Sequence, residues 1–286
     1  MRHSTSISVG PRTFRIGSDW RGPIEALEAL YAAYPTAGEI PHFTVRLESD
    51  RLWRRFIRPS VSIRGDYMLP DALPVSLSHG LIAAEMAMNL QMALGERSFL
   101  LLHAATVEKK GKALILTGES GSGKSTLSAL LMTNGWRFLG DEFALIDPLT
   151  GLAHPFPRPI SLKNAAIAVM EAAYTKGQFG PLLEATPKGD IRHLVPNASA
   201  LTAMHEPAKP AAILFPSFGL PKAMREVGRG EVFVRLTQAS TNYTALGEAG
   251  FSALTRLVTS VPAHAIDYPD TATGLKLVEQ IWQGLA

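Results

Sequence analysis

Apolar and polar positions alternate with two different periods in the first part of the chain. Residues 6–10 (SISVG) and 13–17 (TFRIG) alternate as half-buried strands around a Gly-Pro turn, and residues 42–49 (HFTVRLES) alternate in the same way. Between them, residues 22–34 place apolar side chains at helical spacing, with Pro23 near the start. The pattern predicts a small unit of strands and a helix.

A proline-containing linker follows this unit. Residues 66–78 (DYMLPDALPVSLS) contain two prolines, and residues 78–93, rich in Ala, Met and Leu, predict a long helix. We therefore predict a small N-terminal α/β domain at residues 1–74 and a second domain at residues 75–286.

Strands and helices alternate in the second domain. Residues 98–118 predict two strands joined by a Lys-Lys-Gly-Lys turn, and a helix then runs from a glycine-rich loop to about Thr133. Residues 136–147 predict a strand, a short interruption and another strand. The later elements are two strands and two helices, at residues 211–218, 231–237, 247–260 and 273–285. This alternation is typical of an α/β fold.

Composition narrows the classes of protein that the chain can represent. It has 286 residues, 46% hydrophobic and 19% charged, which is enough for one large or two small globular domains. The formal net charge of +3 is too small to indicate nucleic-acid binding. The absence of cysteine excludes disulfides, thiolate catalysis and zinc–cysteine sites. No apolar run approaches the roughly 20 residues that span a bilayer, and we expect a cytoplasmic protein without a membrane partner.

The segment GESGSGKS, residues 118–125, satisfies the phosphate-loop pattern G-x-x-x-x-G-K-[ST] between a predicted strand and a predicted helix. Glycines allow backbone N–H groups to converge on an anion, and the helix N-terminus adds partial positive charge. The residues expected to hold ATP are Gly118, Glu119, Ser120, Gly121, Ser122, Gly123, Lys124, Ser125 and Thr126. The alternatives are a glycine-rich turn without a ligand and a loop that binds nucleotide without hydrolysing it.

Two further features indicate what happens to the last phosphate. The acidic pair Asp141-Glu142 follows soon after the loop helix, whereas in transport, recombination and helicase ATPases the acidic strand normally comes much later. The guanine-reading motif N-K-x-D is absent. His103 ends a strand just before the strand that feeds the loop, where it could lie near the phosphates, although a lone histidine there would more often be structural.

Together, His103, the loop at 118–125 and Asp141-Glu142 resemble the catalytic domain of HPr kinase/phosphorylase. The segment NGWRFLGDEFALID, residues 134–147, is similar to that family's acidic segment. The resemblance extends over nearly the whole chain to the branch called HPr kinase-related kinase A, including HPFPRPISLKN and TNYTALGEAGF.

The resemblance implies a P-loop kinase core related to phosphoenolpyruvate carboxykinase, with ATP and Mg²⁺. It implies that Lys124 binds phosphate, that Asp141 is the catalytic base with His103 beside it, and that Ser125 and Glu142 bind the metal. Arg158 and Asn242 are weaker matches to an arginine and an asparagine of the family. A homo-oligomer is compatible with the resemblance.

The chain also departs from the family. Glu142 stands where aspartate is usual, and proline-rich PFPRPISLKN, residues 155–164, replaces the signature around the family's arginine. These departures make HPr an uncertain target. We predict a kinase that transfers the γ-phosphate to a hydroxyl, on a serine of a peptide or small protein. The alternatives are a sugar or polyol kinase and a nucleotide-binding regulatory subunit without transfer activity.

Two other segments combine basic side chains with aromatic or polar ones. Residues 51–58 (RLWRRFIR) interleave arginines with Trp53 and Phe56, which fits either a solvated loop or a surface that docks an acidic peptide or polyphosphate. Residues 186–194 (TPKGDIRHL) contain Lys188 and fit either a substrate-facing loop or an ordinary connector.

Overall fold

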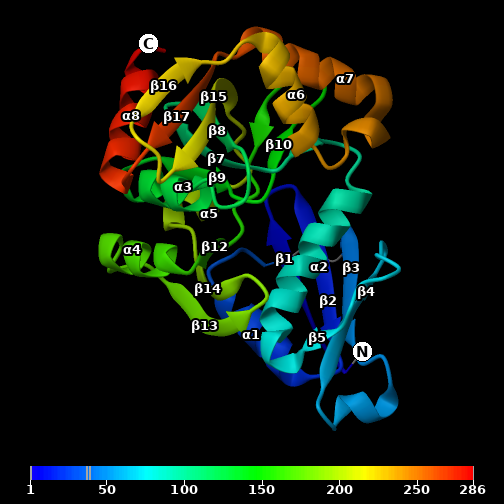
Figure 1. Ribbon diagram of the computed structural model, residues 1–286. Coiled ribbons are helices and arrows are strands. Elements are labelled where there is room, and N and C mark those ends of the chain that lie inside the picture. Colours follow the sequence, from blue (N-terminus) through cyan, green and yellow to red (C-terminus); the bar gives the residue numbers. More distant parts are fainter. Residues whose placement is uncertain (1, 37, 39, 286) are drawn as a thin grey trace.

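The computed structural model describes residues 2–36, 38 and 40–285, so the predicted domain limits at 1 and 286 lie outside the described residues. It is a mixed α/β structure, as the alternation of strand and helix patterns predicts, and its described residues form four sheets (Figure 1). Within the described residues, no helix is both long and apolar enough to cross a membrane.

The N-terminal part of the chain forms a five-stranded sheet in sequential order. Only β2 and β3 are parallel, because the helix α1 (Arg21–Leu30) and its flanking residues connect them. The strands are β1 (His3–Val9), β2 (Arg12–Ser18), β3 (Phe43–Glu48), β4 (Ser60–Gly65) and β5 (Val75–Ser76). In β3 every second side chain is buried, so the alternation in the sequence correctly predicts a strand with one face in the core.

The long helix α2 (Gly80–Gly95) packs on this N-terminal sheet (Figure 1). Its buried apolar side chains, Leu81, Ala83, Ala84, Ala87, Met88 and Met92, share one apolar core with strands β2 and β3. The helix that the sequence assigns to the second domain therefore completes the core of the first part. The division at 74/75 itself stays a prediction.

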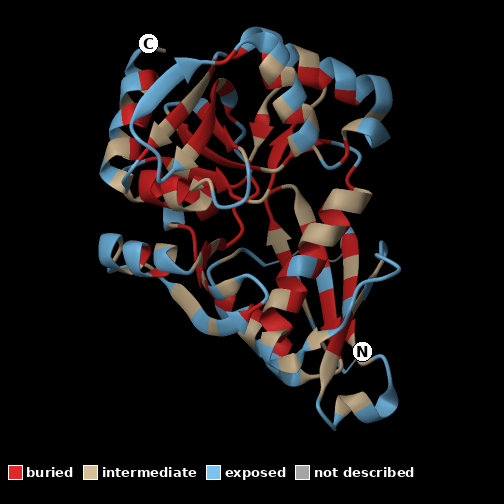
Figure 2. Cartoon of the chain, in the orientation of Figure 1, coloured by how far each residue is buried: buried red, intermediate tan, exposed pale blue. Residues whose placement is uncertain are grey.

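The rest of the chain is built around a six-stranded sheet in the order β16-β17-β15-β8-β7-β9. Strand β8 is parallel to β15, which is parallel to β17, and the remaining pairs are antiparallel. The strands are β7 (Ala104–Lys109), β8 (Lys112–Thr117), β9 (Arg137–Gly140), β15 (Lys209–Phe218), β16 (Ala223–Glu226) and β17 (Ala263–Tyr268). Figure 2 shows that the inner strands are buried, whereas β16 at the edge is exposed.

Helices cover both faces of this sheet, which gives three layers. On one face, Leu114 and Leu116 of β8 pack with α3 (Lys124–Thr133) and α8 (Thr271–Gln283). On the other face, Ala113 and Ile115 pack with α6 (Arg229–Ala239) and α7 (Tyr243–Ser260). A strand buried on both faces has an unbroken apolar sequence, which is why ALIL in β8 shows no alternation.

One predicted element has the wrong type. Residues 231–237 (EVFVRLT) alternate like a strand but form most of helix α6. Only Val232 and Leu236 are buried in this helix, and their separation of one helical turn places both on the face toward the sheet. Valine lowers helix propensity only slightly, so tertiary packing decides the structure of this segment.

Two smaller sheets complete the fold. One contains β6 (Leu100–Leu102), β10 (Ala144–Ile146) and β11 (Ala153–His154). The other contains β12 (Ile160–Lys163), β13 (Phe179–Thr186) and β14 (Gly189–Leu194). Helix α4 (Ala165–Ala173) follows β12, and the short α5 (Ala198–Thr202) follows β14. In Figure 1 the second of these sheets lies below the six-stranded sheet and beside α1 of the N-terminal unit.

Candidate active site

The order of the central strands brings three separated sequence features to one edge of the six-stranded sheet. Strand β7 lies between β8 and β9 and is antiparallel to both. The start of β7, the end of β8 and the end of β9 therefore lie together. His103 precedes β7, the phosphate loop follows β8, and Asp141 follows β9. The sheet thus brings together the histidine, the loop and the acidic pair that the sequence analysis selected.

The phosphate loop depends on two glycines with left-handed backbone. Gly121 has φ +86° and Gly123 has φ +93°, values that residues with a side chain rarely adopt. A Cβ atom at Gly123 would also lie 2.5 Å from the hydroxyl oxygen of Tyr268. Gly123 is therefore required both by the turn and by the tyrosine packed against it.

Lys124 is the first residue of α3 and is buried at the base of the loop, with 6% of its surface exposed. Its Nζ donates hydrogen bonds to the carbonyl oxygens of Gly118 (2.8 Å) and Glu119 (2.7 Å). Burial lowers the pKa of Lys124, while the charges of Asp141 and Glu142 act in the opposite direction. The structure thus holds an ammonium group inside the loop.

Asp141 is the most perturbed acid of the site. It is buried, and its Oδ1 atom has no hydrogen-bond partner among the described residues. Burial, and then the charge of Glu142, raise its pKa to about 7, against the opposing effects of Ser125, Lys163 and Lys124. A carboxyl group that titrates near neutral pH can exchange a proton with a substrate.

His103 contacts the second acid of the pair. Its Nδ1 lies 3.1 Å from the backbone oxygen of Glu142 and 3.8 Å from the Oε2 atom of the same residue. The Thr117 hydroxyl donates to the backbone oxygen of His103 (3.0 Å), which ties the histidine to the end of the strand that feeds the loop. The arrangement holds the imidazole beside the acidic pair.

These residues surround a cavity of about 680 Å³. The predicted residues that line it are His103, Ser120, Gly121, Gly123, Lys124, Ser125, Thr126, Asp141 and Glu142. The other predicted loop residues, Gly118, Glu119 and Ser122, do not line it. Gly118 and Glu119 accept hydrogen bonds from Lys124 instead, and the buried Ser122 hydroxyl has no partner among the described residues.

The cavity has a second wall, of which the sequence indicates only the segment that carries Lys188. It comes from the end of β12, from α4, from the β13–β14 hairpin and from the strand ends of β15 and β17. Its polar and aromatic members are Ser161, Lys163, Asn164, Lys188, Phe218, Tyr268 and Thr271. Within the described residues, neither Lys163 nor Lys188 forms an ion pair with a carboxylate.

The turn that carries Lys188 is held in place by local hydrogen bonds. Asn164 Oδ1 accepts from the backbone N–H of Asp190 (3.1 Å), and the Thr186 hydroxyl accepts from the N–H of Lys188 (3.1 Å). Gly189 has φ +85°, and a Cβ atom there would lie 2.2 Å from Asn164 Oδ1. The polar, glycine-containing sequence TPKGD indicates a turn at this place. Lys188, which this turn carries, is part of the cavity wall.

The oxygen atoms of the site can accommodate a magnesium ion. No group of three or more His, Cys, Asp or Glu side chains with metal-binding geometry occurs among the described residues. Magnesium in phosphoryl-transfer sites needs only one or two protein ligands, because phosphate oxygens and water complete its shell. The Ser125 hydroxyl, the Glu142 carboxylate and the unpartnered Oδ1 of Asp141 line the same cavity. These hard oxygen donors fit the ion.

Arg158 and Asn242, the two weaker family matches, do not line the cavity. Arg158 forms a buried ion pair with Glu85 and donates to the Tyr31 hydroxyl (3.3 Å). Asn242 accepts from the backbone of Leu101 (2.9 Å) and donates to backbone oxygens that precede β6. Both side chains connect parts of the fold.

The chain has limited similarity to known proteins. Residues 80–177, less than half of the chain, match a family model described as SynChlorMet cassette protein ScmC, which is not a model of the HPr kinases. Among curated proteins, none matches the chain in sequence. A solved structure, the Hpr(Ser) kinase/phosphatase from Coxiella burnetii, matches with 16% identity over 64% of this chain and 94% of that chain, with a TM-score of 0.29. This superposition is too loose to support a function, so the chemistry follows from the site itself.

Proposed function

We propose that the protein is an ATP-dependent phosphotransferase that moves the γ-phosphoryl group to a hydroxyl, on a serine of a peptide or small protein. The observation that carries this proposal is the carboxyl group of Asp141, which is buried, unpartnered at Oδ1 and in the same cavity as the phosphate loop. A protein that only binds nucleotide needs no proton acceptor in this cavity. A kinase needs one to accept the proton of the attacking hydroxyl.

Asp141, Lys124 and His103 have separate roles in the proposed reaction. Asp141 accepts the proton of the acceptor hydroxyl, whose oxygen forms a bond to the γ-phosphorus. The bond from the γ-phosphorus to the bridging oxygen breaks, and ADP leaves with that electron pair. Lys124 exchanges its bonds to the Gly118 and Glu119 carbonyls for phosphate oxygens and offsets their charge. His103 holds the Glu142 backbone, and thereby the acidic pair, in place.

Magnesium fits beside these groups. Ser125 and Glu142 would hold it, and it would supply charge neutralisation for the phosphates. The likeness of His103, the loop and the acidic pair to HPr kinase-related kinases supports the same division of roles.

The test is to incubate the protein with γ-labelled ATP, Mg²⁺ and separate panels of serine-containing polypeptides and small polyols. Asp141→Asn should keep the affinity for a fluorescent ATP analogue and lose transfer by about 10²–10⁴-fold, because the general base is gone. Lys124→Ala should lose both. The matched control is Asp71→Asn, an exposed carboxylate that does not line the cavity.

The position of the label decides among the candidate functions. Label on a polypeptide supports the proposal, and label on a polyol replaces the acceptor with a small molecule. Undiminished ATP turnover by the Asp141→Asn protein would remove Asp141 as the base. Nucleotide binding without turnover in the wild-type protein would leave a regulatory binding subunit.

A further inference from the structure

The N-terminal unit exposes an unusual group of side chains between β3 and β4. The segment contains the 3₁₀ turn η1 (Leu52–Arg55), and its apolar side chains Leu52, Phe56 and Ile57 are 87%, 78% and 62% exposed. Three arginines, Arg51, Arg54 and Arg58, belong to the same segment. These six residues are called the arginine face. Large apolar side chains that gather on an exposed segment indicate a surface for a partner.

The charges of the arginine face are not compensated within the protein. Among the described residues, no carboxylate lies within ion-pair distance of Arg51, Arg54 or Arg58. Arg55, in the same turn, lies 3.8 Å from Asp19 and donates to its backbone oxygen (2.8 Å). Arg55 therefore anchors the segment to the domain, and its neighbours are left to attract an anionic partner.

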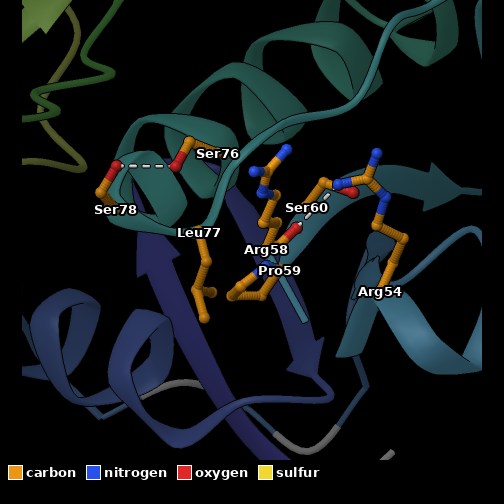
Figure 3. A pocket seen from close by; sticks show the side chains of 7 residues that line it. All are labelled: Arg54, Arg58, Pro59, Ser60, Ser76, Leu77 and Ser78. Atoms are coloured by element: carbon orange, nitrogen blue, oxygen red, sulfur yellow. Dashed lines mark hydrogen bonds between the residues drawn. The ribbon is translucent and has the colours of Figure 1, made fainter. Parts of the chain in front are cut away.

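A hollow of about 610 Å³ adjoins the arginine face. It is lined by Arg54, Arg58, Pro59, Ser60, Ser76, Leu77 and Ser78 (Figure 3). The Nη1 atom of Arg54 donates to the backbone oxygen of Arg58 (3.1 Å), and Arg58 itself has a left-handed backbone with φ +45°. Arg54 and Arg58 thus line one hollow together with Ser60, whereas the Ser76 and Ser78 hydroxyls, 2.9 Å apart, are hydrogen-bonded to each other. Guanidinium forks bind carboxylates with paired hydrogen bonds.

The surroundings favour a polypeptide over the other anionic partners. Single-stranded nucleic acid is held by stacking on free aromatic rings. Here the Arg54 guanidinium already covers the Trp53 ring at 4.5 Å, which leaves Phe56 as the one largely free ring of the segment. Leu52 and Ile57 cannot stack on a base. A lipid surface is flat and would leave the hollow beside Arg54 and Arg58 unfilled. Carboxylates that alternate with apolar side chains match what the face offers.

We propose that the arginine face docks an acidic segment of a polypeptide. The carboxylates of that segment pair with Arg54 and Arg58, and its apolar side chains pack on Leu52, Phe56 and Ile57. The face shares no residue with the wall of the phosphate-loop cavity. In Figure 1 residues 52–55 are at the bottom of the view, well below α3. The docking proposal therefore stands independently of the proposed reaction.

Fluorescence anisotropy with a labelled synthetic peptide, in which Glu alternates with Leu and Phe, tests the proposal on the full-length protein. The double variant Arg54→Gln/Arg58→Gln should bind this peptide about tenfold or more weakly, and Phe56→Ser should also weaken binding. The matched control, Arg21→Gln/Arg46→Gln, removes the same charge from two exposed arginines of the same unit that have acidic partners. It should bind like the wild-type protein.

Further probes separate charge from apolar contact and from other ligand classes. Peptides with Gln for Glu, or Ser for Leu and Phe, should both bind more weakly than the parent peptide. Three results would overturn the proposal: no binding of the parent peptide to the wild-type protein, equal loss in the control double variant, or tighter binding of an oligothymidine or of phosphatidylglycerol vesicles than of the peptide. Since Arg54, Arg58 and Phe56 lie at the surface, thermal unfolding should confirm that each variant is folded.

Discussion

The phosphate-loop cavity and the arginine face treat charge in opposite ways. In the cavity, Lys124 and Asp141 are buried, and each changes the proton affinity of the other. On the arginine face, Arg51 and Arg58 are exposed and have no acidic partner among the described residues. Burial makes a charge costly and responsive to its neighbours, which suits chemistry. Exposure leaves a charge hydrated and free to attract a partner reversibly, which suits docking.

The largest expected effect comes from a substitution that disturbs the packing around the phosphate loop. Gly123→Ala places a methyl group in a left-handed backbone and against the Tyr268 hydroxyl, so we expect a loss of about 2–5 kcal/mol in the free energy of unfolding. Binding of a fluorescent ATP analogue should fall by roughly a hundredfold or more, because the loop amides move. Urea unfolding and anisotropy measure the two effects.

Gly135→Ala is the matched control for this substitution. Gly135 has φ +84°, but no atom lies within 4 Å of the position of its Cβ. It should show only the strain of the left-handed backbone, about 1–2 kcal/mol, and normal nucleotide binding. Equal behaviour of the two variants would mean that the cavity is no more tightly packed than an ordinary helix end.

The second effect is a pH dependence of stability that originates at Asp141. Its pKa is raised from 3.8 to about 7 in the folded protein, so the folded state keeps a proton that the unfolded state loses. The stabilising contribution of Asp141 to the free energy of unfolding is therefore fully present below about pH 4 and is lost as the pH rises to about 7. By the usual conversion this is at most on the order of 4 kcal/mol.

Asp141→Asn isolates this contribution, because the other titrating groups are common to both proteins. The stability of the variant relative to the wild-type protein should increase between about pH 4 and about pH 7 and then stay constant. Urea unfolding at several pH values measures the difference. A difference that does not change with pH would show that Asp141 titrates normally and that the cavity does not perturb it.

The cavity shows what this sequence can and cannot predict about the site. The loop residues and Asp141-Glu142 are local motifs, and His103 is placed beside them because β7 and β8 form a simple hairpin. For Lys188 the sequence leaves two interpretations open, a substrate-facing loop and an ordinary connector, and nothing in the sequence selects Lys163. The two lysines come from β12 and from the β13–β14 hairpin, a sheet whose strand pairing depends on contacts distant in sequence. No spacing rule connects such residues with a phosphate loop.

The same limit explains the helix α6. Its sequence alternates over residues 231–237, and only the surrounding core selects the two residues that are buried. The strands that alternate in the N-terminal sheet were predicted correctly, because one face of that sheet is covered and the period itself defines the structure. Local pattern is therefore sufficient where burial follows it, and fails where tertiary packing overrides it.

The smallest expected effect tests the contrast in charge directly. Raising the ionic strength from about 0.05 M to about 0.5 M should weaken peptide docking by about 1 kcal/mol, because exposed charges are screened. The affinity for adenosine, which carries no charge, should not change. Docking that is insensitive to salt would mean that the apolar residues of the arginine face, and not its arginines, attract the peptide.

The buried pair of Arg158 and Glu85 has a consequence for how the protein can be handled. Arg158 precedes β12, Glu85 belongs to α2, and the Tyr31 hydroxyl that donates to Glu85 (2.8 Å) follows α1. A polypeptide that begins at residue 75 would lose Tyr31 and expose the apolar side of α2. An N-terminal fragment that ends before Arg158 would leave the buried carboxylate of Glu85 without its partner. The two sheets should consequently melt in one cooperative transition, and neither should survive limited proteolysis without the other.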